Sequence, residues 1–180
     1  MKLSGGSRSA MKLLLHDANV LIDLITVGLL DITFRLPYVM ETTDFVVQEI
    51  VPQDQRKAIQ RIIDADKLTV CNATSEMVGE IVRLHHDIPA LSIADCSVIC
   101  HALATDAVVL SGDGLLRKTA RAKSLKVCGT LWVLQQLVSE NMIEPSLAIE
   151  KLTELMVKNV RLPKQECSRL IEQWRTLTLR

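Results

Sequence analysis

The segment MKLLLHDAN, residues 11–19, decides the fold that the sequence predicts. It opens with an apolar run, Met11 to His16, which ends abruptly at Asp17. A short apolar run followed by a helix-capping residue is typical of a buried parallel strand that leads directly into a helix. We therefore expect a strand over Met11 to His16 and a first helix over Val20 to Gly28.

The same alternation of strand and helix repeats along the chain. Short apolar runs predict further strands at Tyr38 to Glu41, Leu68 to Asn72, Ala107 to Leu110 and Lys126 to Cys128. Helical periodicity predicts helices starting near Thr43 and over Gln55 to Asp66, Ser75 to His86, Ser92 to Ala104 and Gly114 to Leu125. Strands that alternate with helices predict an α/β fold, with a parallel sheet sandwiched by helices.

After Gly129 the pattern contains helices only. We expect them over Leu131 to Met142, Pro145 to Val160 and Pro163 to Leu177, where both prolines suit a first helical turn. Three parts follow from this change of pattern. Residues 1–10 are expected to be a flexible leader or a remnant of an expression tag, residues 11–130 an α/β domain, and residues 131–180 a helical extension packed on the domain or on a partner.

Composition narrows the class of protein. The 180 residues are 48% hydrophobic and 23% charged, which is typical of a soluble globular chain and excludes disorder, collagen-like repeats and a small disulfide knot. The 21 basic and 21 acidic residues balance, so a nucleic-acid partner would need a local basic patch. Five cysteines without a CxxC pair or a secretory signal predict a cytoplasmic location. The longest candidate membrane span, Ala18 to Leu30, is interrupted by Asp23, so no membrane contact is expected.

Four acidic residues fall where a parallel sheet places its ligand site. Asp17 and Asp113 directly follow apolar strands, and ligands bind outside the carboxyl ends of such strands. Repulsion between two neighbouring acids favours a raised pKa or a bound divalent cation. Glu49 and Asp95 are lone acids beside apolar residues near helix starts. Four carboxylates without a matching set of Cys or His residues suit Mg²⁺ or Mn²⁺ better than zinc.

These blocks resemble the PIN domain of metal-dependent ribonucleases. The resemblance rests on Asp17 to Asp23, Val46 to Glu49, Ala94-Asp95 and Leu110 to Asp113, which stand in the family's order. It covers about Met11 to Thr130, so residues 11–130 are expected to be a PIN-like domain with a Rossmann-like sheet. Residues 129–143 further resemble a prokaryotic sub-family of PIN proteins that carries a short helical tail.

The resemblance also implies an activity and its residues. PIN proteins, including the VapC-like toxins of toxin–antitoxin pairs, hydrolyse RNA with a metal-activated water. By this resemblance Asp17 and Asp95 would be the main ligands of Mg²⁺ or Mn²⁺, Asp113 a ligand or a supporting acid, and Glu49 an orienter of water. Asn19 and Ser111 would hydrogen-bond these carboxylates. The sub-family often has an acid immediately before the fourth one, and here that position is Gly112.

A basic strip follows Asp113 directly. Arg117, Lys118 and Arg121 lie within its predicted helix, and the two arginines share a helical face at i, i+4. Such a strip beside an acidic metal site suits the phosphate backbone of RNA, although a plain solvated face has the same pattern. The C-terminal helices carry apolar residues that need burial on the domain or on a partner, which predicts a homodimer or higher homo-oligomer, or a bound antitoxin. These residues are Leu147, Leu152, Leu155 and Met156.

Simpler interpretations stand beside these. Asp17 could only cap a helix, Asp95 could only balance a helix dipole, and Asp113 could belong to an ordinary turn. Glu49 could be a solvated surface acid, and Asp23 a helix-surface or supporting residue. Cys96, Cys100 and His101 lack a second ligand pair for zinc, so we interpret them as core packing. No GxGxxG or P-loop motif is present, and a haloacid dehalogenase would need an acid where Asn19 stands. The main alternative to a nuclease is a non-catalytic PIN-like module that binds RNA or protein.

Overall fold

A five-stranded parallel sheet forms the centre of the described structure, a computed structural model that covers residues 12–178. The leader expected at residues 1–10 lies outside this range. Within it the strand order is β3-β2-β1-β4-β5. The strands are β1 (Leu13–His16), β2 (Val39–Thr43), β3 (Thr69–Cys71), β4 (Val108–Leu110) and β5 (Val127–Cys128). The predicted parallel sheet is confirmed.

Strand β1 lies at the centre of the sheet. Leu14 pairs with Met40 of β2 on one side and with Val108 of β4 on the other. Leu14 and Leu15 are 1% and 0% exposed, because helices cover both faces of the sheet. Burial on two faces explains why this strand is a continuous apolar run rather than an alternating one.

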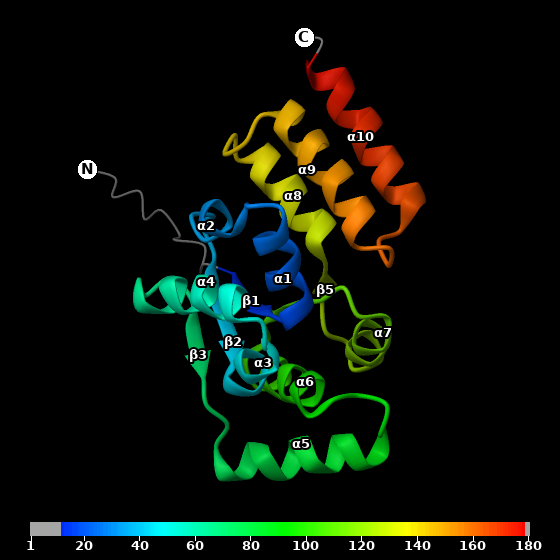
Figure 1. Cartoon of the computed structure of the whole chain (residues 1–180). Coiled ribbons are helices and arrows are strands. Elements are labelled where there is room, and N and C mark those ends of the chain that lie inside the picture. Colours follow the sequence, from blue (N-terminus) through cyan, green and yellow to red (C-terminus); the bar gives the residue numbers. More distant parts are fainter. Residues whose placement is uncertain (1–11, 179–180) are drawn as a thin grey trace, which may run out of the picture.

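Seven helices among the described residues belong to the α/β part. They are α1 (Ala18–Thr26), α2 (Leu30–Thr33), α3 (Asp44–Glu49), α4 (Gln53–Asp64), α5 (Ser75–Asp87), α6 (Ile93–Thr105) and α7 (Gly114–Ala122). Helix α6 contacts β1, β2 and β4, while α1 packs against α2, α3 and α4. In Figure 1, α1 and α2 lie on one side of the sheet and α5, α6 and α7 on the other. The single turn of α2 was not predicted, because four residues show no periodicity.

Three further helices complete the described chain. They are α8 (Thr130–Ser139), α9 (Pro145–Lys158) and α10 (Lys164–Thr178), which lie side by side at one end of the molecule (Figure 1). Leu152 and Leu155 of α9 are fully buried within the chain, together with Trp174 of α10. These apolar residues are therefore buried by other residues of the same chain. Among the described residues, none of the helices combines the length and apolar character needed to cross a membrane.

The chain reverses its direction of travel across the sheet between β1 and β4. From β1 it proceeds to β2 and β3, then crosses to β4 and β5 on the other side. Helix α1 follows β1 after one residue, Asp17, and α7 follows β4 after Ser111, Gly112 and Asp113. A crevice at the carboxyl ends of two such strands is the usual ligand position of a doubly wound sheet.

Candidate functional site

Asp17 is a buried carboxylate held in place on both of its oxygens. It caps α1, and its Oδ1 accepts a hydrogen bond of 2.7 Å from the backbone N–H of Ala18. Its Oδ2 accepts one of 2.7 Å from Ser111 Oγ and another from the side-chain amide of Asn19. The residue is only 3% exposed. The two side chains expected to support this acid therefore both contact it.

Burial raises the pKa of Asp17 to about 6. The hydrogen bond from Ser111 opposes this rise, whereas the negative charges of Asp95 and Glu49 add to it. The charge of Asp113 in turn raises the pKa of Asp95, where burial is again the largest cause. One charge affects the pKa of another group only within electrostatic range. Asp95 and Glu49 are therefore within range of Asp17, and Asp113 is within range of Asp95, which links the four predicted acids.

Asp95 and Asp113 are positioned by the starts of two helices. Asp95 forms a capping box with Ser92 at the start of α6: the Ser92 N–H donates to its Oδ2 at 2.8 Å, and its own N–H donates to Ser92 Oγ at 3.0 Å. Asp113 caps α7, and its Oδ1 accepts from the N–H groups of Leu115 and Leu116. Asp17 therefore caps a helix, as its simple interpretation had it, and Asp113 is a helix cap rather than part of an ordinary turn. Asp95 stands in the first turn of α6, where it completes a capping box whose N-cap is Ser92.

Ser111 connects the ends of β1 and β4. Its hydroxyl donates to Asp17 and accepts a hydrogen bond of 3.0 Å from the backbone N–H of Asp113. Asn19 adds a second connection, because its Oδ1 accepts from the N–H of Gly112 at 2.6 Å. Both acids that follow strands thus belong to one hydrogen-bonded unit.

Glu49 is the least constrained of the four acids. It is the last residue of α3, and its side chain is exposed. Its negative charge adds to the rise that burial causes in the pKa of Asp17, and this effect links it to the other acids. The four acids do not form a preassembled cage: among the described residues, the metal-type cluster with ligand atoms within 4.8 Å of one another is Glu41, Cys71 and His101.

The donor chemistry of the acids nevertheless fits a hard divalent cation. Asp17, Asp95 and Asp113 offer only carboxylate oxygens, and within the described part of the chain none of the three forms a salt bridge. Oxygen donors with uncompensated charge suit Mg²⁺ or Mn²⁺. Burial is the largest cause of the raised pKa of Asp17 and of Asp95, and their hydrogen bonds offset it only in part.

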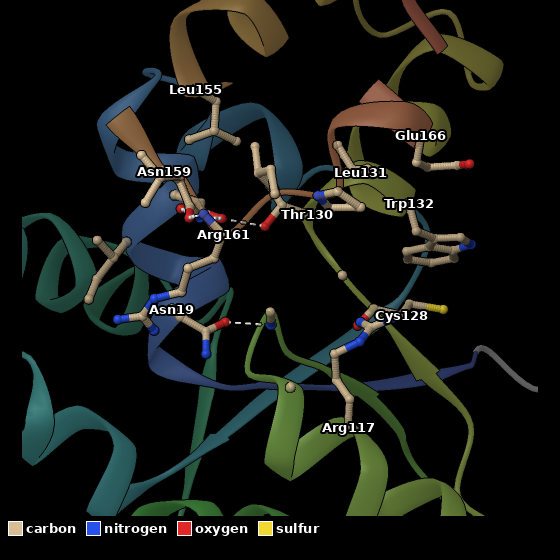
Figure 2. Close-up of a pocket in the computed structure, with 18 of the residues that line it drawn as sticks. Asn19, Arg117, Cys128, Thr130, Leu131, Trp132, Leu155, Asn159, Arg161 and Glu166 are labelled. Carbon is tan, nitrogen blue, oxygen red and sulfur yellow. Dashed lines mark hydrogen bonds between the residues drawn. The ribbon is translucent and has the colours of Figure 1, made fainter. Parts of the chain in front are cut away.

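A cavity of about 1010 Å³ opens beside this unit (Figure 2). Asn19 and Gly112 lie on its wall toward the acids, and Arg117, Trp132 and Arg161 line it from other elements. The Nη1 of Arg117 donates to the carbonyl oxygens of Ser111 at 2.7 Å and Cys128 at 2.9 Å, which joins the ends of β4 and β5. Lys118 and Arg121 of the same helix are exposed.

Asp23 lines this cavity, and the sequence pattern left two interpretations of it open. It is 7% exposed, and its carboxylate accepts hydrogen bonds from Thr130 Oγ1 at 2.7 Å and from Asn159 Nδ2 at 3.0 Å. Of the two expectations for Asp23, support is correct and a place on the helix surface is wrong. Sequence analysis missed Thr130 and Asn159, because neither stands in a recognisable motif.

Comparison with known proteins decides the family. The family model described as PIN domain matches residues 13–176. The chain belongs to the PIN-domain family. Its PIN-like fold and the recognised family are thereby confirmed, and the match includes the C-terminal helices as far as α10.

Two solved structures similar to this PIN protein contain VapBC proteins. VapBC-1 from nontypeable Haemophilus influenzae has 16% sequence identity, with 66% of this chain and 98% of that chain covered and a TM-score of 0.48. VapBC2 from Rickettsia felis, bound to a DNA fragment from their promoter, has 13% identity, with 65% and 98% covered and a TM-score of 0.46. No curated protein matches the chain.

Gly112 stands beside Asn19 in a contact that leaves little room for a side chain. A Cβ atom at this position would lie 3.1 Å from Asn19 Oδ1, which is a tight contact. Glycine permits Asn19 to approach the backbone and accept from its N–H. A short hydrogen bond to the backbone thus occupies the space next to Gly112.

Proposed function

We propose that this PIN protein is a metal-dependent endoribonuclease that hydrolyses RNA phosphodiester bonds. The observation that carries the proposal is the gathering of Asp17, Asp95 and Asp113 at the switch point of the sheet, in a chain of the PIN-domain family. Family membership supports a nuclease in general. The choice of RNA and of Mg²⁺ or Mn²⁺ is the finer part of the proposal.

In this proposal Asp17, Asp95 and Asp113 hold the cation, and Glu49 orients a water from the rim. A bound divalent cation supplies an activated water and stabilises the charge that develops on the phosphate. Ser111 and Asn19 keep the carboxylate of Asp17 in one orientation through their hydrogen bonds. Such supporting hydrogen bonds commonly set how well a carboxylate binds metal.

The RNA backbone is proposed to approach along α7. Lys118 and Arg121 are exposed cations on that helix, and Arg117 lines the cavity beside the acids. Burial lowers the pKa of Arg117, and the positive charge of Arg121 lowers it further. Because Arg117 already donates to two backbone carbonyls, we assign it a positioning role and assign phosphate contact to Lys118 and Arg121.

Two partners belong to the same proposal. The protein would act as the toxin of a toxin–antitoxin pair, with an antitoxin protein as its inhibitor, and it would form a homodimer or higher homo-oligomer. The burial of Leu152 and Leu155 within the chain removes part of the sequence argument for self-association. Exposed Val157 and Val160, at 79% and 80%, still offer an apolar contact near the end of α9.

The experiment that tests the proposal is calorimetric titration of Mn²⁺ into the wild type and Asp95→Asn, followed by incubation with single-stranded RNA. Asparagine keeps the helix-capping oxygen and removes the charge. We expect specific Mn²⁺ binding and RNA cleavage in the wild type, and loss of both in the variant. Asp54→Asn, an exposed acid in the first turn of α4, is the matched control and should behave as the wild type.

Equal Mn²⁺ binding by the wild type and Asp95→Asn would contradict the four-acid site. Absence of Mn²⁺ binding and of cleavage would favour the alternative function, a non-catalytic PIN-like module that binds RNA or protein.

A further inference from the structure

A second cluster of metal-type ligands lies away from the four acids. Glu41 of β2, Cys71 of β3 and His101 of α6 each offer one ligand atom, and these atoms all lie within 4.8 Å of one another. His101 stands six residues after Asp95 on α6, which corresponds to about 9 Å along the helix. The cluster is therefore not a part of the proposed nuclease site.

Two of the three side chains contact the same carboxylate oxygen of the third. Glu41 Oε2 lies 2.8 Å from His101 Nε2, and the Cys71 thiol donates to the same oxygen at 3.3 Å. Parallel pairing of β2 with β3 sets this arrangement, with Glu41 opposite Thr69 and Thr43 opposite Cys71. Three donors from three elements thus surround one small volume between the edge strand and α6.

The donor set selects the kind of metal. One thiol, one imidazole and one carboxylate are the ligands that zinc prefers, whereas Mg²⁺ and Ca²⁺ prefer oxygen alone. Ligands at about 2.0–2.3 Å from a tetrahedral zinc ion lie roughly 3.4 to 3.8 Å apart. The observed separations of 2.8 and 3.3 Å need only a small expansion to reach that spacing.

A nearby acid adds an independent observation. Asp44 directly follows β2. Burial and the Glu41 carboxylate are the larger causes of the raised pKa of the Cys71 thiol, and the charge of Asp44 adds to them, so Asp44 lies within electrostatic range of the cluster. Its Oδ1 is buried and has no hydrogen-bond partner among the described residues. A buried carboxylate oxygen without a partner is costly unless an ion or water satisfies it.

We propose that Glu41, Cys71 and His101 bind a Zn²⁺ ion, with Asp44 as the fourth ligand or as the acceptor for a water that completes the tetrahedron. The side chains of His101 and Glu41 are 12% and 19% exposed, which leaves an entry path from solvent. Binding releases the Cys71 thiol proton to solvent, while the neutral His101 ring ligates through Nε2 and carries its one ring proton on Nδ1. The ion would join edge strand β3 to β2 and α6 and would stabilise the folded chain.

The experiment uses Co²⁺ as a spectroscopic substitute for Zn²⁺, with the full chain kept reduced and in excess Mg²⁺. We expect a thiolate-to-cobalt charge-transfer band that saturates at about one Co²⁺ per chain and disappears on addition of Zn²⁺. Cys71→Ser should abolish the band. Cys128→Ser, which alters a half-buried thiol on β5, should retain it.

A second variant and readout guard against loss of folding in Cys71→Ser. His101→Gln leaves the thiol intact, and its affinity for Co²⁺ should fall at least about tenfold. Zn²⁺ should raise the unfolding midpoint of the wild type and of Cys128→Ser but not that of His101→Gln. An unchanged band in Cys71→Ser, an unchanged Co²⁺ affinity in His101→Gln, or a wild type without the band would overturn the zinc site and leave Glu41, Cys71 and His101 as a hydrogen-bonded cluster only.

Discussion

His16, the last residue of the central strand β1, is fully buried. It is 0% exposed, its ring stacks on Phe34 with centroids 5.3 Å apart, and its Nε2 lies 3.1 Å from Met40 Sδ. Its Nδ1 has no hydrogen-bond partner among residues 12–178. Burial lowers the pKa of His16 from 6.5 to about 3, so the folded protein keeps this ring neutral.

This lowered pKa predicts a pH dependence of stability. Below pH 6.5 the unfolded chain protonates His16 and the folded chain does not, so acid favours unfolding by ~1.4 kcal/mol per pH unit until the folded pKa is reached. Asp17 and Asp23, whose pKa values are raised, act in the opposite direction. Urea unfolding of the wild type and His16→Gln between about pH 6.5 and about pH 5 isolates the histidine.

The wild type should lose about 2 kcal/mol more than His16→Gln over this interval. Equal losses in the two proteins would mean that His16 becomes protonated without unfolding.

At the scale of elements, helix starts have two uses in this protein. Three of the four acids of the candidate site stand at helix starts: Asp17 and Asp113 cap α1 and α7, and Asp95 completes the capping box of α6. A helix N-terminus stabilises a nearby negative charge through its free N–H groups and its dipole. Three such termini at one edge of the sheet allow acids to gather there without salt bridges.

The capping box of α6 gives a prediction at this scale. Ser92→Ala removes the hydroxyl that accepts from the Asp95 N–H, and it should lower the free energy of unfolding by ~1 kcal/mol. Ser92→Gly should cost only a few tenths of that, since glycine leaves the N-terminus open to water. Urea denaturation of both variants measures the difference, and equal destabilisation by Ala and Gly would argue against a capping role.

At the scale of the whole molecule, a buried polar group ties the C-terminal helices to the sheet part. Asp23 of α1 accepts hydrogen bonds from Thr130 at the start of α8 and from Asn159 at the end of α9. The cavity beside the acids is lined by residues of both parts of the chain. We therefore propose that residues 131–180 are a functional part of the domain rather than a separate unit.

Removal of this connection should be costly. Asp23→Ala leaves Thr130 and Asn159 without their acceptor, and we expect the free energy of unfolding to fall by about 1–3 kcal/mol. Asp64→Ala, an exposed acid in α4, is the control and should change it by less than about 0.5 kcal/mol. A double-mutant cycle of Asp23→Ala with Thr130→Val measures the coupling, and additive effects would contradict the proposed connection.

Local sequence determined the order of elements and the positions of the helix caps. The apolar run before Asp17 is a strand because helices bury both its faces, and Ser92 with Asp95 forms a capping box because the two residues lie three positions apart. These features depend on neighbouring residues, so a pattern of residue types predicts them. Asp17, Asp95 and Asp113 could be nominated for the same reason, since each follows a strand or stands in the first turn of a helix. Glu49 was expected near a helix start, and it is instead the last residue of α3.

Only the tertiary structure decided which distant residues meet. Asp23 lies 107 residues from Thr130 and 136 from Asn159, and His101 lies 60 from Glu41. His101 was interpreted as core packing, yet it reaches the Glu41 carboxylate from α6. Such contacts depend on the order of strands and the packing of helices across the sheet, which no local pattern encodes. The sequence by itself therefore predicted the fold and its capping acids, whereas the packed structure created the supporting contacts and the second ligand cluster.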